Sequence, residues 1–227
     1  MLQFLAETSL TALASLAIIK SNPEMQTEEK SSVIYTVGHS NHPLDRFLQI
    51  LQTHRIELLA DIRSHPHSQY SPHFNGSALE AAVSEAGIRY LFLGKELGGQ
   101  PQDQEFYDRE GHVLYSRLAQ SRAFLKGISE LERLIATART ALLCGEENPA
   151  ECHRRLLVGR VLGERGWQVV HLRGDGSRQT EEELSQAEAN ARPKEVQLSL
   201  FDASEEPGWK STRSVLEKRA PRHSSGR

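Results

Sequence analysis

The chain has 227 residues and a formal net charge of −3, and 38% of its residues are hydrophobic while 25% are charged. This composition is typical of one globular domain with appended segments, and it argues against a protein that holds nucleic acid by bulk positive charge. Two cysteines are too few for a disulfide framework, so we expect a reducing, cytoplasmic environment.

Residues 1–30 differ in character from the rest of the chain. Their apolar run, in MLQFLAETSLTALASLAIIK, is interrupted by Glu7 and has no basic residue before it. The run is therefore too short and too mixed for a transmembrane helix, and it lacks the positive leading region of a signal peptide. We expect residues 1–30 to be a flexible, dispensable extension, with a docking helix as the alternative, and we expect no membrane association.

Short apolar segments rich in β-branched and aromatic residues predict strands at 33–37, 57–62, 89–93, 140–144 and 168–172. Segments with helical spacing of apolar residues lie between them, at 44–51, 79–86, 125–135 and 151–165. Gly87 and Gly166 stand where helix C-caps belong. Strands that alternate with helices predict parallel βαβ units. We therefore predict an α/β fold: a single three-layer domain over residues 31–175 with a mostly parallel, roughly five-stranded sheet.

Polar residues of catalytic type follow each predicted strand. In an open α/β sheet, ligands bind beyond the carboxyl ends of the strands, so these residues are expected to meet at one edge. The candidate catalytic residues are His39, Asp61, Glu146 and His153. The candidate phosphate- or anion-binding residues are Ser40, Arg63, Gly98, Gly99, Cys152, Arg154 and Arg155.

Several of these residues also have a purely structural interpretation. Asp61 could pair with Arg63 inside the fold, and His39 could help to cap the next helix. The Gly98-Gly99 pair could form a turn that needs a positive φ rather than a phosphate cradle. His171, at the end of the fifth predicted strand, could be a hydrogen-bonded core histidine.

The strongest local signal is the segment TALLCGEENPAECHRRLLVGRVL, which begins as a strand and ends as a helix. Cys152, His153 and Arg154 would lie in the first helical turn, where free backbone N–H groups and the helix dipole favour an anion. Arginine side chains suit phosphate, and the same field would lower the pKa of the Cys152 thiol.

Three chemical interpretations of this segment stay open. The turn could bind a phosphate of a nucleotide or nucleic acid. Cys144 or Cys152 could be a nucleophile, although their spacing to the arginines differs from that of cysteine phosphatases. Cys144, Cys152 and a histidine could hold zinc, although a Cys-x₇-Cys spacing is not a usual short knuckle. Cys144 alone is most simply a small buried hydrophobe. We assign no metal ligand from the sequence, and it names no cofactor.

Taken together, the motifs resemble the family called domain of unknown function 488. The resemblance is carried by YTVGHSNHPLDRFLQIL, ADIRSHPHSQYSPHFN, GIRYLFLGKELGG, LLCGEENPAECHRRLL and VVHL, in order over residues 33–173. It implies a single α/β domain with a Cys-His-Arg motif at its heart, and it implies little about activity. The motif positions are Gly38, His39, Ser40, Asp61, Arg63, Pro66, Ser68, Leu97, Gly98, Gly99, Cys144, Glu146, Cys152, His153, Arg154 and His171.

Residues 176–227 are predominantly polar and are expected to form a flexible tail, with room for a short helix around 180–190. An apolar island, QLSLF at 197–201, resembles the peptide by which bacterial polymerases and repair enzymes dock on the replicative sliding clamp. Leu198, Leu200 and Phe201 would fill apolar clefts, and Gln197 would form hydrogen bonds at the rim. The alternative is that this segment packs within the chain as a further strand.

These features predict a protein that processes nucleic acid or nucleotides in DNA repair or replication, as a hydrolase or transferase if it is an enzyme. Its anion site would be the 144–155 turn, and its partners would be the sliding clamp and a nucleic acid or nucleotide. Two alternatives remain. One is a non-catalytic nucleotide-sensing or DNA-damage adaptor, and the other is a metal-binding or thiol-redox protein that uses Cys144 and Cys152.

Overall fold

The computed structural model describes residues 32–191 and 208–215, and the other residues are not described. The N-terminal extension at 1–30 and the clamp-like peptide at 197–201 therefore lie outside the described residues. Among the described helices, none has the length and apolar character needed to cross a membrane.

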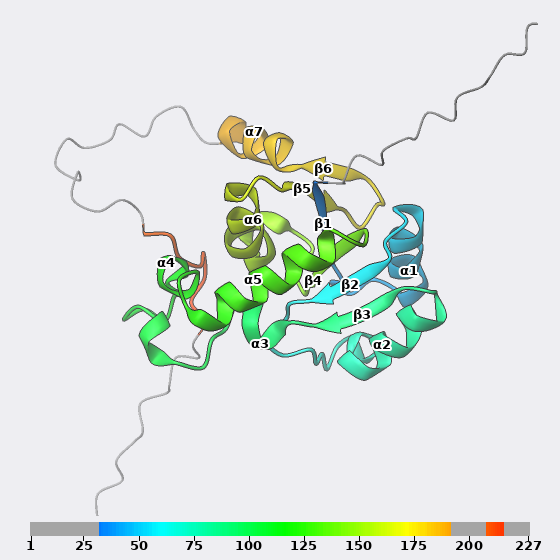
Figure 1. The fold of residues 1–227 in the computed structure, drawn as a ribbon, viewed down its shortest axis with the longest axis horizontal. Coiled ribbons are helices and arrows are strands. Elements are labelled where there is room, and N and C mark those ends of the chain that lie inside the picture. The colour runs from blue at the N-terminus through cyan, green and yellow to red at the C-terminus, as the bar shows by residue number, and fades with distance from the viewer. Residues whose placement is uncertain (1–31, 192–207, 216–227) are drawn as a thin grey trace, which may run out of the picture.

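One sheet of six strands forms the centre of the fold, in the order β3-β2-β4-β1-β5-β6 (Figure 1). The first five strands pair in parallel, and β6 pairs antiparallel with β5. The strands are β1 (Val33–Gly38), β2 (Leu58–Asp61), β3 (Arg89–Phe92), β4 (Thr140–Cys144), β5 (Gln168–Leu172) and β6 (Arg178–Thr180). The predicted α/β class, the mostly parallel sheet and the five predicted strands are thus confirmed, and β6 is an addition.

Helices cover both faces of the sheet. The α-helices are α1 (Leu44–Thr53), α2 (Gly76–Glu85), α3 (Gly94–Leu97), α4 (Tyr115–Leu118), α5 (Arg122–Ile135), α6 (Arg160–Glu164) and α7 (Glu181–Ala191). Short 3-10 turns are η1 (Pro72–Phe74), η2 (Gln104–Phe106) and η3 (Pro149–Glu151), and η4 (Arg154–Gly159) is a π-helix. Gly87 and Gly166 follow α2 and α6 with positive φ, as expected for helix C-caps.

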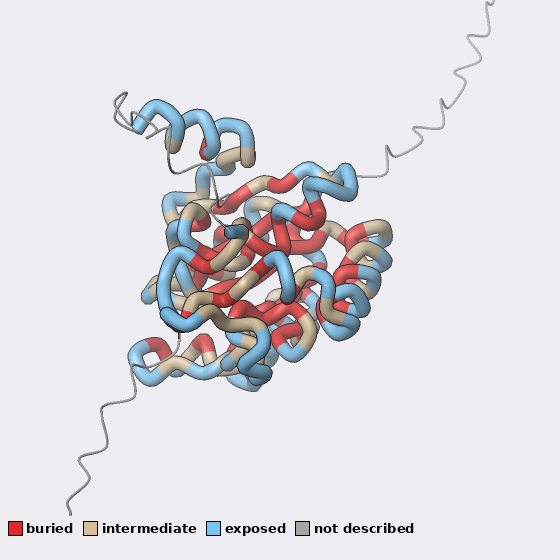
Figure 2. The backbone as a smooth tube through the Cα atoms, turned by 90° about the vertical axis from the view of Figure 1, so that its left-hand side faces the viewer, coloured by how far each residue is buried: buried red, intermediate tan, exposed pale blue. Residues whose placement is uncertain are grey.

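Two hydrophobic clusters hold the three layers together. Successive strand residues point to opposite faces, so Leu142 of β4 belongs to the cluster that contains Phe124 of α5, whereas Leu143 belongs to the cluster that contains Phe47 of α1. Figure 1 shows α5 and α6 on one side of the sheet and α1 and α2 on the other. In Figure 2 the buried segments gather in the middle of the molecule, where the strands run.

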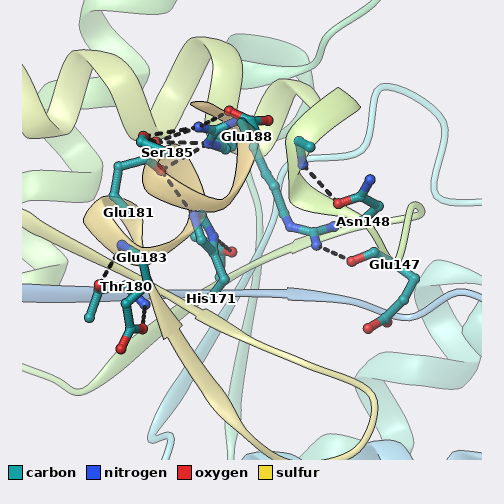
Figure 3. Close-up of polar contacts among 12 residues, drawn as sticks. Glu147, Asn148, His171, Thr180, Glu181, Glu183, Ser185 and Glu188 are labelled. Atoms are coloured by element: carbon teal, nitrogen blue, oxygen red, sulfur yellow. Dashed lines mark hydrogen bonds and ion pairs between the residues drawn. The ribbon is translucent and has the colours of Figure 1, made fainter. Parts of the chain in front are cut away.

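The domain continues past its expected end at residue 175. The structure adds β6 and α7 at the edge beyond β5. Helix α7 is mostly exposed (Figure 2), and its buried residue is Leu184. Arg155 ties this helix to the domain through ion pairs with Glu181 and Glu188. Figure 3 shows Glu181, Ser185 and Glu188 facing the same point, with His171 below them.

A second part of the expected tail, residues 208–215, also packs on the domain. Trp209 donates its indole N–H to the carbonyl of Leu156 over 2.7 Å. The segment pairs with residues 111–116 through backbone hydrogen bonds, and Ser211 exchanges two hydrogen bonds with Val113. We call residues 208–215 the C-terminal strap.

Candidate functional site

A pocket of about 710 Å³ lies at the carboxyl edge of β1, β2 and β4. Five predicted site residues line it, namely His39, Arg63, Gly99, Glu146 and His153, together with Cys144. Further walls come from the 64–68 loop and from residues 211–215 of the strap. The pocket stands where the chain reverses its direction across the sheet, since α1 and α2 follow β1 and β2 on one face and α6 follows β4 on the other. Such switch points leave a crevice between strand ends.

Four side chains converge at the floor of this pocket. The thiols of Cys144 and Cys152 donate to the same carboxylate oxygen of Glu146, over 2.8 and 3.1 Å. The Nδ1 atom of His153 lies 3.4 Å from the Cys144 sulfur. One donor atom from each of the four lies within 4.8 Å of the others, so this set could hold a metal ion. We call these four residues the floor cluster.

His153 is fixed from its other side. Its Nε2 lies 3.0 Å from the carbonyl oxygen of Ile62 at the end of β2, and a carbonyl can only accept, so Nε2 carries a proton. Gly99 allows the ring to lie this close, because a Cβ at that position would stand 2.6 Å from the ring carbon Cγ of His153. The predicted Gly98-Gly99 turn therefore serves close packing, and neither glycine has a positive φ.

The floor cluster is electrostatically coupled. Burial alone would raise the pKa of Glu146, but the hydrogen bonds from the two thiols outweigh it and lower this pKa to about 2. Burial and the hydrogen bond to Cys144 raise the pKa of the Cys152 thiol well above its usual range. Without a further cation, Glu146 is thus a carboxylate and Cys152 a neutral thiol. This is the reverse of the lowered Cys152 pKa that the sequence suggested.

Asp61 and Arg63 form a buried ion pair behind the pocket wall. Arg63 donates Nε to Asp61 over 2.9 Å and a second guanidinium nitrogen to the other carboxylate oxygen. Tyr90 donates its hydroxyl to the same carboxylate over 2.7 Å. Asp61 has no exposed surface and does not line the pocket, so its side chain orients Arg63 instead of meeting a ligand.

His39 completes this wall. Arg63 donates to its Nε2 over 3.1 Å, and Nδ1 donates to the carbonyl of Ser40 over 2.8 Å. Burial, and then the charge of Arg63, lower the pKa of His39 to about 4, so this imidazole is neutral at pH 7. Both ring nitrogens are occupied, which leaves His39 a positioning role. Ser40 has a positive φ of 45° and is not part of the pocket lining.

Arg154 does not face the pocket as a phosphate ligand, which corrects the sequence-based expectation. Its side chain is fully buried, and its guanidinium donates to the backbone carbonyls of Glu146 and Glu147. A Cβ at Gly38 would overlap the Glu146 carbonyl, so β1 must carry glycine at this point. Arg154 therefore fixes the turn that returns Glu146 to Cys144.

Arg155 and the backbone N–H of Cys152 also have partners within the fold. Arg155 forms ion pairs with α7, and the backbone N–H of Cys152 donates to the carbonyl of Pro149. The N–H groups of Arg155 and Leu156 both donate to the Cys152 carbonyl. The expected first turn of a regular α-helix is instead a 3-10 turn followed by a π-helix.

The strap and the 64–68 loop supply pocket residues that are not among the predicted catalytic and anion-binding residues. Arg213, on the strap, pairs with Glu151, and its side chain is 76% exposed. His65 and His67 add two exposed imidazoles at the rim. The one available signal for the strap was Trp209, a large aromatic residue inside a polar tail.

A model of the family described as domain of unknown function DUF488 matches residues 43–161, which include the whole floor cluster and Arg154. Searches of curated proteins and of solved structures found no match.

We expect Arg154→Ala to lower the free energy of unfolding by about 3 kcal/mol, because it removes two hydrogen bonds from a charged donor to buried carbonyls. The exposed Arg133→Ala variant is the matched control and should lose less than about 1 kcal/mol. Urea unfolding measures both. Equal stability of the two variants would contradict the structural role of Arg154.

We expect the protonation of His39 to lower the free energy of unfolding at acidic pH. The unfolded chain binds this proton near pH 6.5 and the folded chain only near pH 4, so the unfolded state holds more protons between these values. Stability is therefore complete above pH 6.5 and falls as the pH drops through 4, by on the order of 3 kcal/mol from this residue. Unfolding free energies from pH 7 to 4 should decline less steeply in His39→Gln than in the parent or in His65→Gln. Identical slopes in all three would refute the assignment.

Proposed function

The chain belongs to the DUF488 family, and from this premise we propose that it is an enzyme, a hydrolase or transferase, that processes a nucleotide or nucleic acid in the pocket at the carboxyl edge of its sheet. One observation carries the proposal. A carboxylate, an imidazole and two thiols converge at the floor of a pocket whose volume suits a nucleotide-sized ligand.

Within the floor cluster, Glu146 and His153 are the groups suited to proton transfer. Glu146 is ionised and lies on the pocket side of the cluster, where it can accept a proton from a water or hydroxyl nucleophile. His153 has one nitrogen occupied by Ile62 and the other turned to the cluster. Of the four catalytic candidates, His39 and Asp61 keep only the role of holding the wall in place.

The residues that we propose to bind the substrate phosphate lie at the pocket rim and not at the start of the helix. Among the described residues, the guanidinium of Arg213 forms an exposed ion pair with Glu151, and such surface pairs are worth about 0–1 kcal/mol, so it can exchange this partner for a phosphate at little cost. His65 and His67 stand on the facing loop and add hydrogen-bond donors. These residues replace Arg154 and Arg155 as the proposed anion-binding groups.

The link to DNA repair or replication is supported by the tail sequence. The QLSLF peptide at 197–201 has the hydrophobic and glutamine positions of a sliding-clamp ligand. Binding to a ring on DNA would raise the local concentration of the enzyme near its substrate without any new contact in the pocket.

The test of catalysis is turnover on a panel of nucleoside triphosphates and of single- and double-stranded oligonucleotides with modified bases. Glu146→Gln should reduce turnover of the responsive substrate about 10²- to 10⁴-fold, because it removes the general base. The control is Glu80→Gln on the exposed side of α2, which should match the parent. Parent protein that turns over no member of the panel, or a Glu146→Gln variant that is fully active, would sink the proposal.

The test of recruitment is binding of the full chain to a purified bacterial sliding clamp by surface plasmon resonance. Joint replacement Leu200→Ala and Phe201→Ala should weaken binding at least about tenfold, because each apolar side chain buried in a cleft contributes more than 1 kcal/mol. Ser199→Ala is the control within the same peptide. Unchanged affinity after the double replacement would show that the clamp does not read this peptide.

A further inference from the structure

The floor cluster presents four donor atoms of three kinds to one point. They are the sulfurs of Cys144 and Cys152, the Nδ1 of His153 and one carboxylate oxygen of Glu146, all within 4.8 Å of one another. From this geometry we propose that the cluster binds one zinc ion at the floor of the pocket. The inference rests on the same site as the proposed function and names its cofactor.

The ring of His153 is oriented so that its Nδ1 atom could ligate a metal. Because Nε2–H donates to the carbonyl of Ile62, the neutral ring carries its lone pair on Nδ1, and this atom faces the Cys144 sulfur at 3.4 Å and the Cys152 sulfur at 4.0 Å. A ligating histidine in a metalloprotein usually donates its second ring nitrogen to a carbonyl or carboxylate in this way, which fixes the ring and its tautomer.

Two thiolates and an imidazole favour zinc over the hard cations. Calcium and magnesium take oxygen ligands, of which this cluster offers a single carboxylate, whereas sulfur and nitrogen ligands in a four-coordinate set are typical of zinc. Zinc binding would displace the protons of the ligands. Each thiol releases its proton to solvent, as does Nδ1 of His153 where it carries one, and the zinc takes both sulfurs and this nitrogen, so that two thiolates and the Glu146 carboxylate surround a double positive charge.

A simple nucleophilic cysteine explains the cluster less well. A reactive thiol needs access to substrate and a positive environment. Here Cys152 is 1% exposed and lies outside the pocket lining. Cys144 lines the pocket but is only 3% exposed, and both sulfurs face a carboxylate that disfavours a thiolate. A second cysteine and a carboxylate at the same point serve no purpose for one nucleophile, but they complete a ligand set.

The four ligands differ in how firmly they are held, which indicates a catalytic rather than a closed structural zinc. Cys144 ends β4, Cys152 is buried, and His153 is fixed by Ile62. Glu146 is the exposed member and stands on the pocket side. Catalytic zinc sites keep three firm protein ligands and one position that exchanges, so Glu146 occupies the place where water or substrate would enter.

The first experiment measures metal in the full chain, purified under a non-thiol reductant. Elemental analysis should find about one zinc per chain. Cobalt(II) titration of the metal-free protein should give the intense near-ultraviolet absorption of sulfur-to-cobalt charge transfer. Cys144→Ser, Cys152→Ser and His153→Asn should each weaken cobalt binding by at least about a hundredfold, since a lost ligand costs more than a lost supporting contact.

Two further variants keep the test decisive if a buried cysteine variant does not fold. Glu146→Gln, on the exposed side of the cluster, should still bind the metal through three ligands, but its visible cobalt spectrum should change. His65→Asn, a pocket histidine outside the cluster, should match the parent in stoichiometry and spectrum. Zinc should also raise the melting temperature of the metal-free parent, by mass action on the folded state.

A parent protein that holds no zinc and gives no sulfur-to-cobalt absorption in the titration overturns the inference. An unchanged cobalt spectrum in Glu146→Gln together with unchanged binding in His153→Asn also overturns it. These outcomes are separate from the proposed function. Metal-free protein that turns over a substrate leaves that function standing, whereas zinc-loaded protein that turns over nothing in the panel supports the zinc site alone.

Discussion

The site depends on one buried charge and the two carbonyl oxygens that surround it. Arg154 has no exposed surface, and its guanidinium holds the backbone oxygens of Glu146 and Glu147. This contact bends the chain after β4 so that Glu146 returns to the sulfur of Cys144. A lysine could not do the same, because a single ammonium lacks the planar fork that reaches two carbonyls at once. Gly38 on the neighbouring strand leaves the space that the contact needs.

The other arginines at this edge of the sheet are also held by partners within the fold. Arg63 is neutralised by Asp61 and orients His39, and Arg155 is neutralised by two carboxylates of α7. Charges placed near the strand ends are thus used to hold loops and helices in position. The pocket floor keeps an ionised carboxylate, Glu146, beside two thiols and an imidazole, a set of groups that can bind a cation. Anion binding is left to the rim, where Arg213 is exposed.

The sequence determined the fold more completely than the site, for physical reasons. Apolar β-rich segments and helical spacing depend on local burial, so the five strands and the helix C-caps at Gly87 and Gly166 were predicted correctly. The edge strand β6 has the polar sequence RQT, and its pairing with β5 shows no apolar pattern. The partners of a buried arginine are set by tertiary contacts, which the local sequence does not encode. The Arg-rich helix start therefore predicts an anion site, whereas Arg154 points inward to backbone carbonyls. The residues of the floor cluster were named individually from the sequence, but their convergence depends on a turn that no spacing rule describes.

The π-helix Arg154–Gly159 connects the pocket to the two segments that were expected to be tail. Three consecutive residues contact three different parts of the domain. Arg154 donates to the backbone of the Glu146–Glu147 turn, Arg155 forms an ion pair with α7, and the carbonyl of Leu156 accepts the indole N–H of Trp209 from the strap. A π-helical turn is wider than an α-helical turn and is frequent at functional sites. Here it lets one short segment fix the floor of the pocket, its strap wall and the last helix of the domain. The clamp-like peptide at 197–201 falls in the stretch between the last two of these attachments. The segments that flank this peptide in the sequence, α7 and the strap, are thus both attached to the π-helix that follows His153.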